Sequence, residues 1–269
     1  MSTRIADRFS RLRAERRPGL VAYLTAGDPN PDKTAGLVLA MERGGADFIE
    51  LGVPFSDPIA DGPVIQRASE RALHKGMTLK GVLDVARQVR HSSQIPLVLF
   101  TYMNPLVRYG FDRLADDAAA AGVDGVLMTD LSVEEAEEPV RKLRARGLDT
   151  IFLAAPTSTE RRLRLVAQYS SGFVYVVSRT GITGEKDSVG SAVGPLVEGL
   201  RSLTSLPLAV GFGISKPEHF QEVGRLADAV VVGSAIVRVI EENGADPSLA
   251  ARLEEFTRQL CGKPQASRL

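Results

Sequence analysis

Residues 48–63 read Phe-Ile-Glu-Leu-Gly-Val-Pro-Phe-Ser-Asp-Pro-Ile-Ala-Asp-Gly-Pro, an apolar β-type run that leads into a polar loop. The run holds one carboxylate, Glu50, and it breaks at Gly52 and Pro54. The loop that follows carries Asp57 and Asp61. An apolar surround raises the pKa of a carboxyl group, which keeps it protonated near neutral pH and able to act as a general acid. The stretch therefore suits proton transfer by a buried Glu with a second carboxylate nearby.

Outside this stretch, short apolar runs alternate with amphipathic helical patterns almost from end to end. The runs show little polar alternation, as is typical of strands that are covered on both faces. The predicted strands are 20–25, 47–51, 96–101, 125–129, 150–154, 173–178, 207–211 and 229–233. About eight βα units without a break in composition predict one α/β domain over residues 1–269. We expect a single (β/α)8 TIM barrel rather than an open sheet.

The N-terminal segment, residues 1–17, is predicted to add a helix to this barrel. In the helical pattern over 3–16, Ile5, Phe9 and Leu12 share one face. We expect this face to plug the bottom of the barrel.

Three further segments depart from a plain alternation of strand and helix. Residues 63–75 predict a helix before the one expected at 79–91, so the second βα unit is enlarged. Residues 178–191 are polar and rich in glycine, which predicts a mobile lid loop that closes over substrate; the alternative is a loop that is merely flexible. Residues 263–269 are expected to be a frayed tail.

A small recurring device marks the predicted strand starts. An Asp stands between a helix and the next strand four times, at Asp47, Asp124, Asp149 and Asp228. Three of these follow a Gly in the position of a helix C-cap, at Gly45, Gly122 and Gly147. Because strand starts form the stability face of a barrel, we interpret these four carboxylates as structural.

Composition and charge exclude several classes of function. Lys plus Arg and Asp plus Glu are equal at 33 each, so no basic surface points to nucleic acid. No apolar stretch reaches the roughly 18 residues that span a bilayer, and the N-terminus lacks the apolar core of a secretory signal. A cytoplasmic location is therefore expected. The only cysteine, Cys261, permits no disulfide within the chain.

Metal chemistry and Schiff-base chemistry are also disfavoured. The three histidines, His74, His91 and His219, are far apart and show no ligand spacing, so no metal site is predicted. A Schiff-base lysine would stand at a strand end, whereas the nearest candidates, Lys186 and Lys216, fall in the lid and at a helix start. Proton chemistry must then come from carboxylates or tyrosines.

Glycine-rich segments follow the predicted sixth, seventh and eighth strands, at 179–184, 211–215 and 233–235. Glycine lets the backbone approach a ligand closely, and a helix N-terminus binds anions. Phosphate binding after the last strands is common in this fold. Together the three segments predict a phosphate site.

The roles of the carboxylates have structural alternatives. If Ile49 and Leu51 pack outward on helices, Glu50 points into the barrel; otherwise it is a buried Glu paired to an Arg. Asp61 precedes Gly-Pro and is also a suitable loop or N-cap residue, so the spacing alone leaves its role open. Asp57 is better interpreted as loop structure or a surface contact.

These pieces together resemble the tryptophan synthase α subunit family, which cleaves indole-3-glycerol phosphate. The resemblance covers residues 4–260, and its second segment is highly specific. The matching segments are 24–29 (Leu-Thr-Ala-Gly-Asp-Pro), 50–58 (Glu-Leu-Gly-Val-Pro-Phe-Ser-Asp-Pro), 60–63 (Ala-Asp-Gly-Pro), 178–184 (Ser-Arg-Thr-Gly-Ile-Thr-Gly) and 211–214 (Gly-Phe-Gly-Ile).

The resemblance implies a retro-aldol carbon–carbon lyase that releases indole and glyceraldehyde 3-phosphate. It makes Glu50 the acid that protonates indole C3 and then the base for the glycerol hydroxyl, and it makes Asp61 the acceptor of the ring N–H. It implies that Thr183 bonds Asp61 on lid closure. The residues implied for the indole pocket are Tyr23, Phe100, Tyr102, Leu127, Tyr175 and Phe212. Those implied for the phosphate cradle are Gly184, Gly213, Gly233 and Ser234.

Two positions depart from the family pattern. Tyr23 stands where Phe is common, and Thr129 stands where Ala is often seen. Both are expected to make the pocket slightly more polar.

The resemblance also implies a partner. A β subunit carrying pyridoxal phosphate would join this chain in an αββα heterotetramer, with the loop around Pro54 and Asp57 at the contact. The chain itself is expected to bind no cofactor. Three alternatives stay open: a free-standing indole-glycerol-phosphate lyase, a phosphosugar isomerase or epimerase on the same barrel, and a catalytically silent regulatory barrel.

Overall fold

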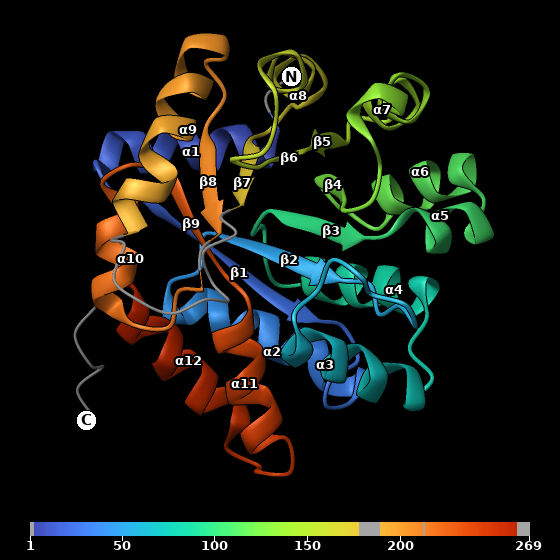
Figure 1. Cartoon of the computed structure of the whole chain (residues 1–269). Helices are drawn as coiled ribbons and strands as arrows, with labels where there is room; N and C mark the ends of the chain where they lie inside the picture. Colours follow the sequence, from blue (N-terminus) through green and yellow to red (C-terminus); the bar gives the residue numbers. More distant parts are fainter. Residues whose placement is uncertain (1–2, 178–188, 212, 263–269) are drawn as a thin grey trace.

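The computed structural model describes residues 3–177, 189–211 and 213–262. Within these residues nine parallel strands form one sheet in the order β5-β4-β3-β2-β1-β9-β8-β7-β6 (Figure 1). The strands are β1 (Gly19–Thr25), β2 (Phe48–Gly52), β3 (Leu97–Thr101), β4 (Gly125–Met128), β5 (Asp149–Ile151), β6 (Leu153–Ala154), β7 (Val174–Val177), β8 (Leu208–Gly211) and β9 (Ala229–Val232).

The two end strands of this order, β5 and β6, are the halves of the predicted fifth strand, separated only by Phe152. Ser171 N donates to Thr150 O, and Tyr175 N donates to Phe152 O. Between these two hydrogen bonds, the chain advances four residues on the β7 side but two residues on the side of β5 and β6. Gly172, with φ of +58°, lies in a bend just before β7 that takes up the extra length. The chain itself therefore closes the sheet, and the predicted (β/α)8 barrel is confirmed with its fifth strand interrupted.

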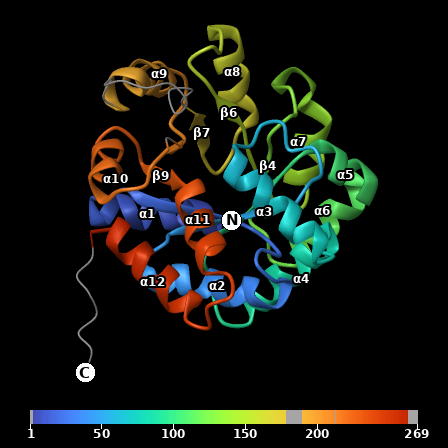
Figure 2. The ribbon, with the colours of Figure 1, turned by 60° about the horizontal axis from the view of Figure 1, so that its bottom comes forward.

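Most helices surround the strands as a ring (Figure 2). Those in the described residues are α1 (Arg4–Glu15), α2 (Pro31–Gly44), α3 (Pro63–His74), α4 (Leu79–Arg90), α5 (Met103–Tyr109), α6 (Phe111–Ala120), η1 (Val133–Glu135), α7 (Glu137–Arg144), α8 (Glu160–Tyr169), α9 (Val189–Leu203), α10 (Pro217–Gly224), α11 (Ser234–Asn243) and α12 (Leu249–Leu260). The predicted helices at 3–16, 63–75 and 79–91 are confirmed as α1, α3 and α4, so the second unit is enlarged as expected.

Helix α5 was not predicted. α5 is a short extra helix after β3, and it ends at Gly110. Gly110, with φ of +92°, is at the same time the residue from which α6 starts. A positive φ is readily adopted by glycine, so Gly110 separates α5 from α6.

Helix α1 plugs the bottom of the barrel, as predicted. Its apolar face, formed by Ile5, Phe9 and Leu12, is buried against strand side chains that point into the barrel. The ring of Phe9 lies 4.5 Å from that of Phe48 and 5.9 Å from that of Phe173. Aromatic packing at these distances closes the bottom with side chains and leaves the opposite end for a ligand.

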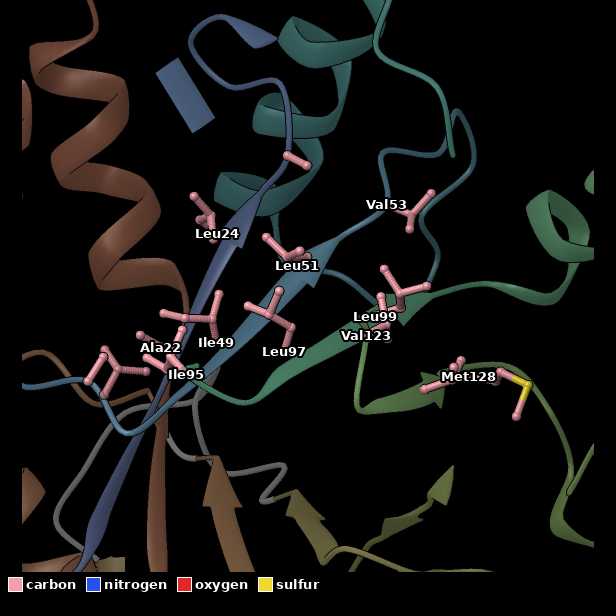
Figure 3. Packing of buried hydrophobic residues seen from close by; sticks show 14 of the residues in the cluster. Ala22, Leu24, Ile49, Leu51, Val53, Ile95, Leu97, Leu99, Val123 and Met128 are labelled. Carbon is pink, nitrogen blue, oxygen red and sulfur yellow. The ribbon is translucent and has the colours of Figure 1, made fainter. Parts of the chain in front are cut away.

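The outward faces of the strands pack on the helices. Ile49 and Leu51 belong to this outer apolar layer, together with Ala22 and Leu24 of β1 and Leu97 and Leu99 of β3 (Figure 3). Because side chains alternate along a strand, the residues between them face the inside of the barrel.

The aspartates at the strand starts are structural, as predicted. Asp47 accepts from Arg17 and from the backbone N–H of Leu20, at 2.9 Å each. Asp228 accepts from Arg201 and from Leu208 N. Asp47 and Asp228 thus each fasten their own strand to a neighbouring strand, whereas Asp149 accepts from the Thr3 hydroxyl before α1.

No helix within the described ranges is long and apolar enough to cross a membrane.

Candidate active site

Glu50 points into the barrel from the middle of β2. Its register partners are Tyr23 on β1 and Val98 on β3. Phe48, two residues earlier, lies in the inner cluster above α1, whereas Ile49 and Leu51 lie in the outer layer. The predicted condition for an inward Glu50 is therefore met.

Glu50 is completely buried, and neither of its carboxyl oxygens has a hydrogen-bond partner among the described residues. Burial raises the pKa of Glu50 from 4.5 to about 8, since the charged form loses its hydration. The alternative of a buried Glu paired to an Arg finds no such partner in the part of the chain that the structure describes. A neutral carboxylic acid without a structural contact is poised to deliver a proton.

Asp61 is the second carboxylate, and it is held at the end of the loop between β2 and α3. Tyr102, which directly follows β3, donates its hydroxyl to Asp61 Oδ2 at 3.0 Å. The same hydroxyl accepts from Ala60 N at 3.0 Å. Burial raises the pKa of Asp61 to about 6, against the opposing effect of the Tyr102 hydrogen bond. Asp61 is thus mainly ionised at neutral pH, while Glu50 is mainly protonated.

Four of the residues expected in the indole pocket face the barrel interior around Glu50. Tyr23 and Phe100 meet edge to face with ring centroids 5.1 Å apart, and Phe100 also contacts the inner cluster. Leu127 and Tyr175 belong to the same cluster. Burial, together with nearby Glu50, raises the pKa of Tyr175 well above its usual value. The walls around the carboxyl group are therefore aromatic and aliphatic, as a flat heteroaromatic ring requires.

The two hydroxyls that depart from the family pattern are both satisfied within the protein. Tyr23 Oη lies 3.2 Å from Thr25 Oγ1, and Thr129 Oγ1 donates to Thr101 O at 3.2 Å. Because both hydroxyls are already bonded within the protein, they make the pocket less polar than the sequence predicted.

Two glycines at strand ends have a role in the site that was not predicted. A Cβ at Gly52 would lie 2.3 Å from Tyr23 Oη, and a Cβ at Gly211 would lie 2.7 Å from Tyr175 Oη. Both glycines make room for a tyrosine that leans across from a neighbouring strand. A glycine within a strand marks a place where another group approaches the backbone closely. Both close approaches could therefore have been predicted from the sequence.

The expected phosphate cradle is described in part. Ser234 is the first residue of α11, and Gly233 precedes it as the N-cap. Gly213 has φ of +24° just beyond β8. The N-terminus of α11 thus offers free N–H groups at the mouth end of β9. Thr183, Gly184, Phe212 and most of the lid lie outside the described residues.

The loop around Pro54 and Asp57 borders an open groove of about 630 Å³ against α3. Its lining includes Phe55, Asp57, Ile59 and Arg67. Asp57 accepts from the Ser56 hydroxyl at 2.6 Å and makes no described contact with Glu50 or Asp61. Its interpretation as a loop residue therefore agrees with the structure.

Fold and site together define a barrel enzyme with a protonated and an ionised carboxyl group at an aromatic mouth. Residues 9–263 match the family described as Tryptophan synthase alpha chain. A chain of that name from Solibacter usitatus is 64% identical over 258 residues, which cover 96% of this chain and 97% of the relative. Another, from Geotalea uraniireducens, is 50% identical over 258 residues, which are 96% of each chain.

Solved structures agree with this match. The tryptophan synthase subunit alpha from Legionella pneumophila str. Paris superposes with a TM-score of 0.90 at 37% identity, covering 97% of both chains. A chain of tryptophan synthase from M. tuberculosis, in an open form with BRD0059 bound, gives a TM-score of 0.88 at 34% identity, covering 97% of this chain and 98% of that one. The chain belongs to the tryptophan synthase alpha chain family. It is a lyase of tryptophan biosynthesis, and the family disfavours the isomerase and silent-barrel alternatives.

Proposed function

We propose that this chain uses Glu50 and Asp61 to cleave indole-3-glycerol phosphate to indole and glyceraldehyde 3-phosphate, the alpha reaction of tryptophan synthase. The single observation that carries the proposal is Glu50, completely buried at the barrel mouth without a hydrogen-bond partner among the described residues. Its raised pKa of about 8 supplies a protonated acid at neutral pH.

In the first step, the Glu50 carboxylic acid gives its proton to C3 of the indole ring. The ring becomes an indolenine cation that can accept an electron pair from the adjacent carbon–carbon bond. Proton delivery by a positioned acid is worth roughly 10²–10⁴ in rate.

In the second step, the Glu50 carboxylate removes the proton of the glycerol hydroxyl next to the bond that breaks. The oxygen electrons form the aldehyde carbonyl, the carbon–carbon bond breaks, and its electron pair returns to the indolenine. Glu50 ends protonated, so the cycle is balanced and needs no external acid or metal.

Asp61 stabilises the cation between these steps by accepting a hydrogen bond from the ring N–H. Its pKa of about 6 leaves it ionised at neutral pH, which supports this role. Loss of one such electrostatic group typically costs about 10²–10³ in rate. Tyr23, Phe100, Tyr102, Leu127, Tyr175 and Phe212 would line the indole site.

The phosphate would bind at Gly184, Gly213, Gly233 and Ser234. The α11 N-terminus supports this placement, because its free N–H groups and dipole attract an anion. In the same proposal, residues 178–191 close as a lid, and Thr183 bonds Asp61.

The direct test is to incubate the chain with indole-3-glycerol phosphate and to measure indole and glyceraldehyde 3-phosphate together. Equal amounts of both products are expected. Interconversion of sugar phosphates without release of indole would instead favour the isomerase alternative.

We further propose a tryptophan synthase β subunit as partner, in an αββα assembly, through the loop around Pro54 and Asp57. The side chain of Ile59 in this loop is 86% exposed, and Val107 on α5 is 64% exposed. Tyr102 joins the two elements, because it precedes α5 and bonds Ala60. Ile59 also lines the open groove against α3, and an exposed apolar side chain at a groove supports a docking surface there.

The partner is tested by measuring the lyase rate with and without the β subunit. A change in rate on addition is expected, whereas an unchanged rate would favour the free-standing lyase. Ile59→Asp should weaken the association, and Gln168→Asp on the exposed side of α8 is the matched control. The pyridoxal phosphate would be held by the partner and not by this chain. A single domain and a cytoplasmic location stay predictions.

A further inference from the structure

An ionic cluster ties α3 to two other elements of the barrel mouth. Arg71 donates through Nε and Nη2 to the two oxygens of Asp28, each at 2.8 Å. Its remaining Nη1 donates to Glu241 on α11, also at 2.8 Å. Asp28 is 1% exposed in the loop after β1. One guanidinium therefore links α3 to both the β1 loop and α11.

Glu241 receives a second arginine from α3. Arg67, one turn before Arg71, donates through Nε and Nη2 to both oxygens of Glu241 at 2.7 and 2.8 Å. The Arg67 hydrogen bond, with that of Arg71, lowers the pKa of Glu241 to about 2. Two-pronged arginine–carboxylate contacts fix direction as well as distance.

The same helix pair is packed by apolar side chains beneath the ions. Ala68 of α3 and Val237 of α11 form a buried cluster with Tyr23, against which Val64 and Ile65 pack. α3 is thus held to α11, which lies beside it in Figure 2, by both ionic and apolar contacts.

Each of the two helices begins beside a group that would bind one end of the proposed substrate. α3 starts at Pro63, two residues after Asp61, and α11 starts at Ser234. In the proposed function Asp61 binds the ring N–H and the α11 N-terminus binds the phosphate. The ionic cluster therefore joins the elements that carry the two binding groups.

We propose that Glu241 and Arg71 are positioning residues that set the spacing between Asp61 and the N-terminus of α11. This spacing selects a substrate in which a ring N–H and a phosphate are joined by a short chain. The inference rests on the proposed function, because it assigns the two ends of the substrate to these two elements.

The test compares a joined substrate with its fragments in the Glu241→Gln variant. This change weakens the bond to α3 while it leaves the partly buried Arg71–Asp28 pair intact. We expect kcat/KM for indole-3-glycerol phosphate to fall about 10- to 100-fold, since misplacement by about 1 Å can cost that much. The dissociation constants of glycerol 3-phosphate and of indole, each measured alone, should change less than about twofold, because a fragment does not sense the spacing.

Glu254→Gln is the matched control. Glu254 on α12 is exposed to a similar degree and accepts from Arg43 on α2 and Arg258 on its own helix, away from the mouth. It should leave both the joined substrate and the fragments unaffected. Arg71→Lys, which keeps the charge but loses the planar fork, also weakens the bond to Asp28 and should lower kcat/KM for the joined substrate at least as much as Glu241→Gln.

The proposal is overturned if Glu241→Gln cleaves the substrate at the parental rate, or if fragment affinities fall as much as kcat/KM. Failure of the parental chain to release indole at all would instead refute the proposed function.

Discussion

Buried carboxyl groups stand at both ends of this barrel, and they differ in their partners. At the bottom, Asp124 accepts from Arg4 at 2.8 Å, from Arg90 at 2.6 Å and from Leu97 N at 2.8 Å. At the mouth, Glu50 accepts nothing from the described residues. Burial is nearly the same, with 5% of Asp124 and none of Glu50 exposed. The partners, and not the depth, separate a carboxylate that holds strands together from one that is free for chemistry.

The largest effect should come from removing the free acid at the mouth. In Glu50→Gln the amide cannot donate a proton to carbon, so we expect kcat to fall by about 10³ or more. Substrate should still bind, because the amide keeps the size of the side chain. Single-turnover release of indole and titration with glycerol 3-phosphate measure the two properties separately.

Release of indole by Glu50→Gln at the parental rate would contradict the assignment. Asp124→Asn is the opposing control, since it alters a buried carboxylate at the other end and should keep the activity per folded molecule.

The next effect is the stability loss at the bottom. Asp124→Asn leaves Arg90 without its charged partner in a mostly buried position. Breaking a buried ion pair costs about 3–5 kcal/mol, and we expect the lower end because Arg4 is partly exposed. Urea unfolding measures the change in the free energy of unfolding. Asp112→Asn, whose carboxylate pairs with Lys142 at the exposed surface, should change it by less than about 1 kcal/mol.

The mouth should also make stability depend on pH. Glu50 has a pKa of about 8 when folded and 4.5 as a free side chain. The folded chain therefore binds one proton more than the unfolded chain between these values, so stability falls as pH rises from about 4.5 to 8. Glu50→Gln lacks this loss. The difference in unfolding free energy between the variant and the parental chain should grow by about 1 kcal/mol per pH unit. A difference that stays constant from pH 5 to 8 would show that Glu50 is not neutral in the folded state.

Activity should follow a bell-shaped pH profile. The reactive form needs Asp61 ionised, above about pH 6, and Glu50 protonated, below about pH 8. The dependence of kcat/KM on pH reports the free enzyme and should show both limbs. A profile that is flat from pH 5 to 9 would contradict this pairing of roles.

The smallest effect should come from Tyr102→Phe. The Tyr102 hydroxyl bonds Asp61 and lowers its pKa, so its loss should move the acid limb of the profile to higher pH. The alkaline limb, set by Glu50, should stay in place. Tyr109→Phe removes a similar tyrosine–aspartate bond, to Asp117 on α6, and should move neither limb. A shift of both limbs in Tyr102→Phe would indicate a general disturbance of the site.

Much of the barrel could be predicted because strand and helix periods are local properties. The inward direction of Glu50 follows from period-two alternation once Ile49 and Leu51 are placed on the outside. The four strand-start aspartates were recognised for the same reason, since each repeats a local pattern. The interruption at Phe152 was not predicted, because it depends on the bend at Gly172, which lies next to it in the fold and precedes β7.

The contacts of Asp61 also could not be predicted from the sequence. Its partner Tyr102 is 41 residues away, and the bond forms only because the loop before α3 folds against the end of β3. The same holds for Glu241, which meets Arg67 and Arg71 across about 170 residues. Such pairs are set by tertiary packing, and one sequence contains no local signal for them.

The glycine at the end of β2 has a consequence for how this pocket can change over generations. The Tyr23 hydroxyl, and the ring atoms next to it, fill the space where a side chain at position 52 would begin. A methyl group at position 52 becomes acceptable only after Tyr23 has been replaced by a smaller residue. If position 52 is enlarged first, the intermediate enzyme is damaged. The replacement of Tyr23 must therefore come before the replacement of Gly52.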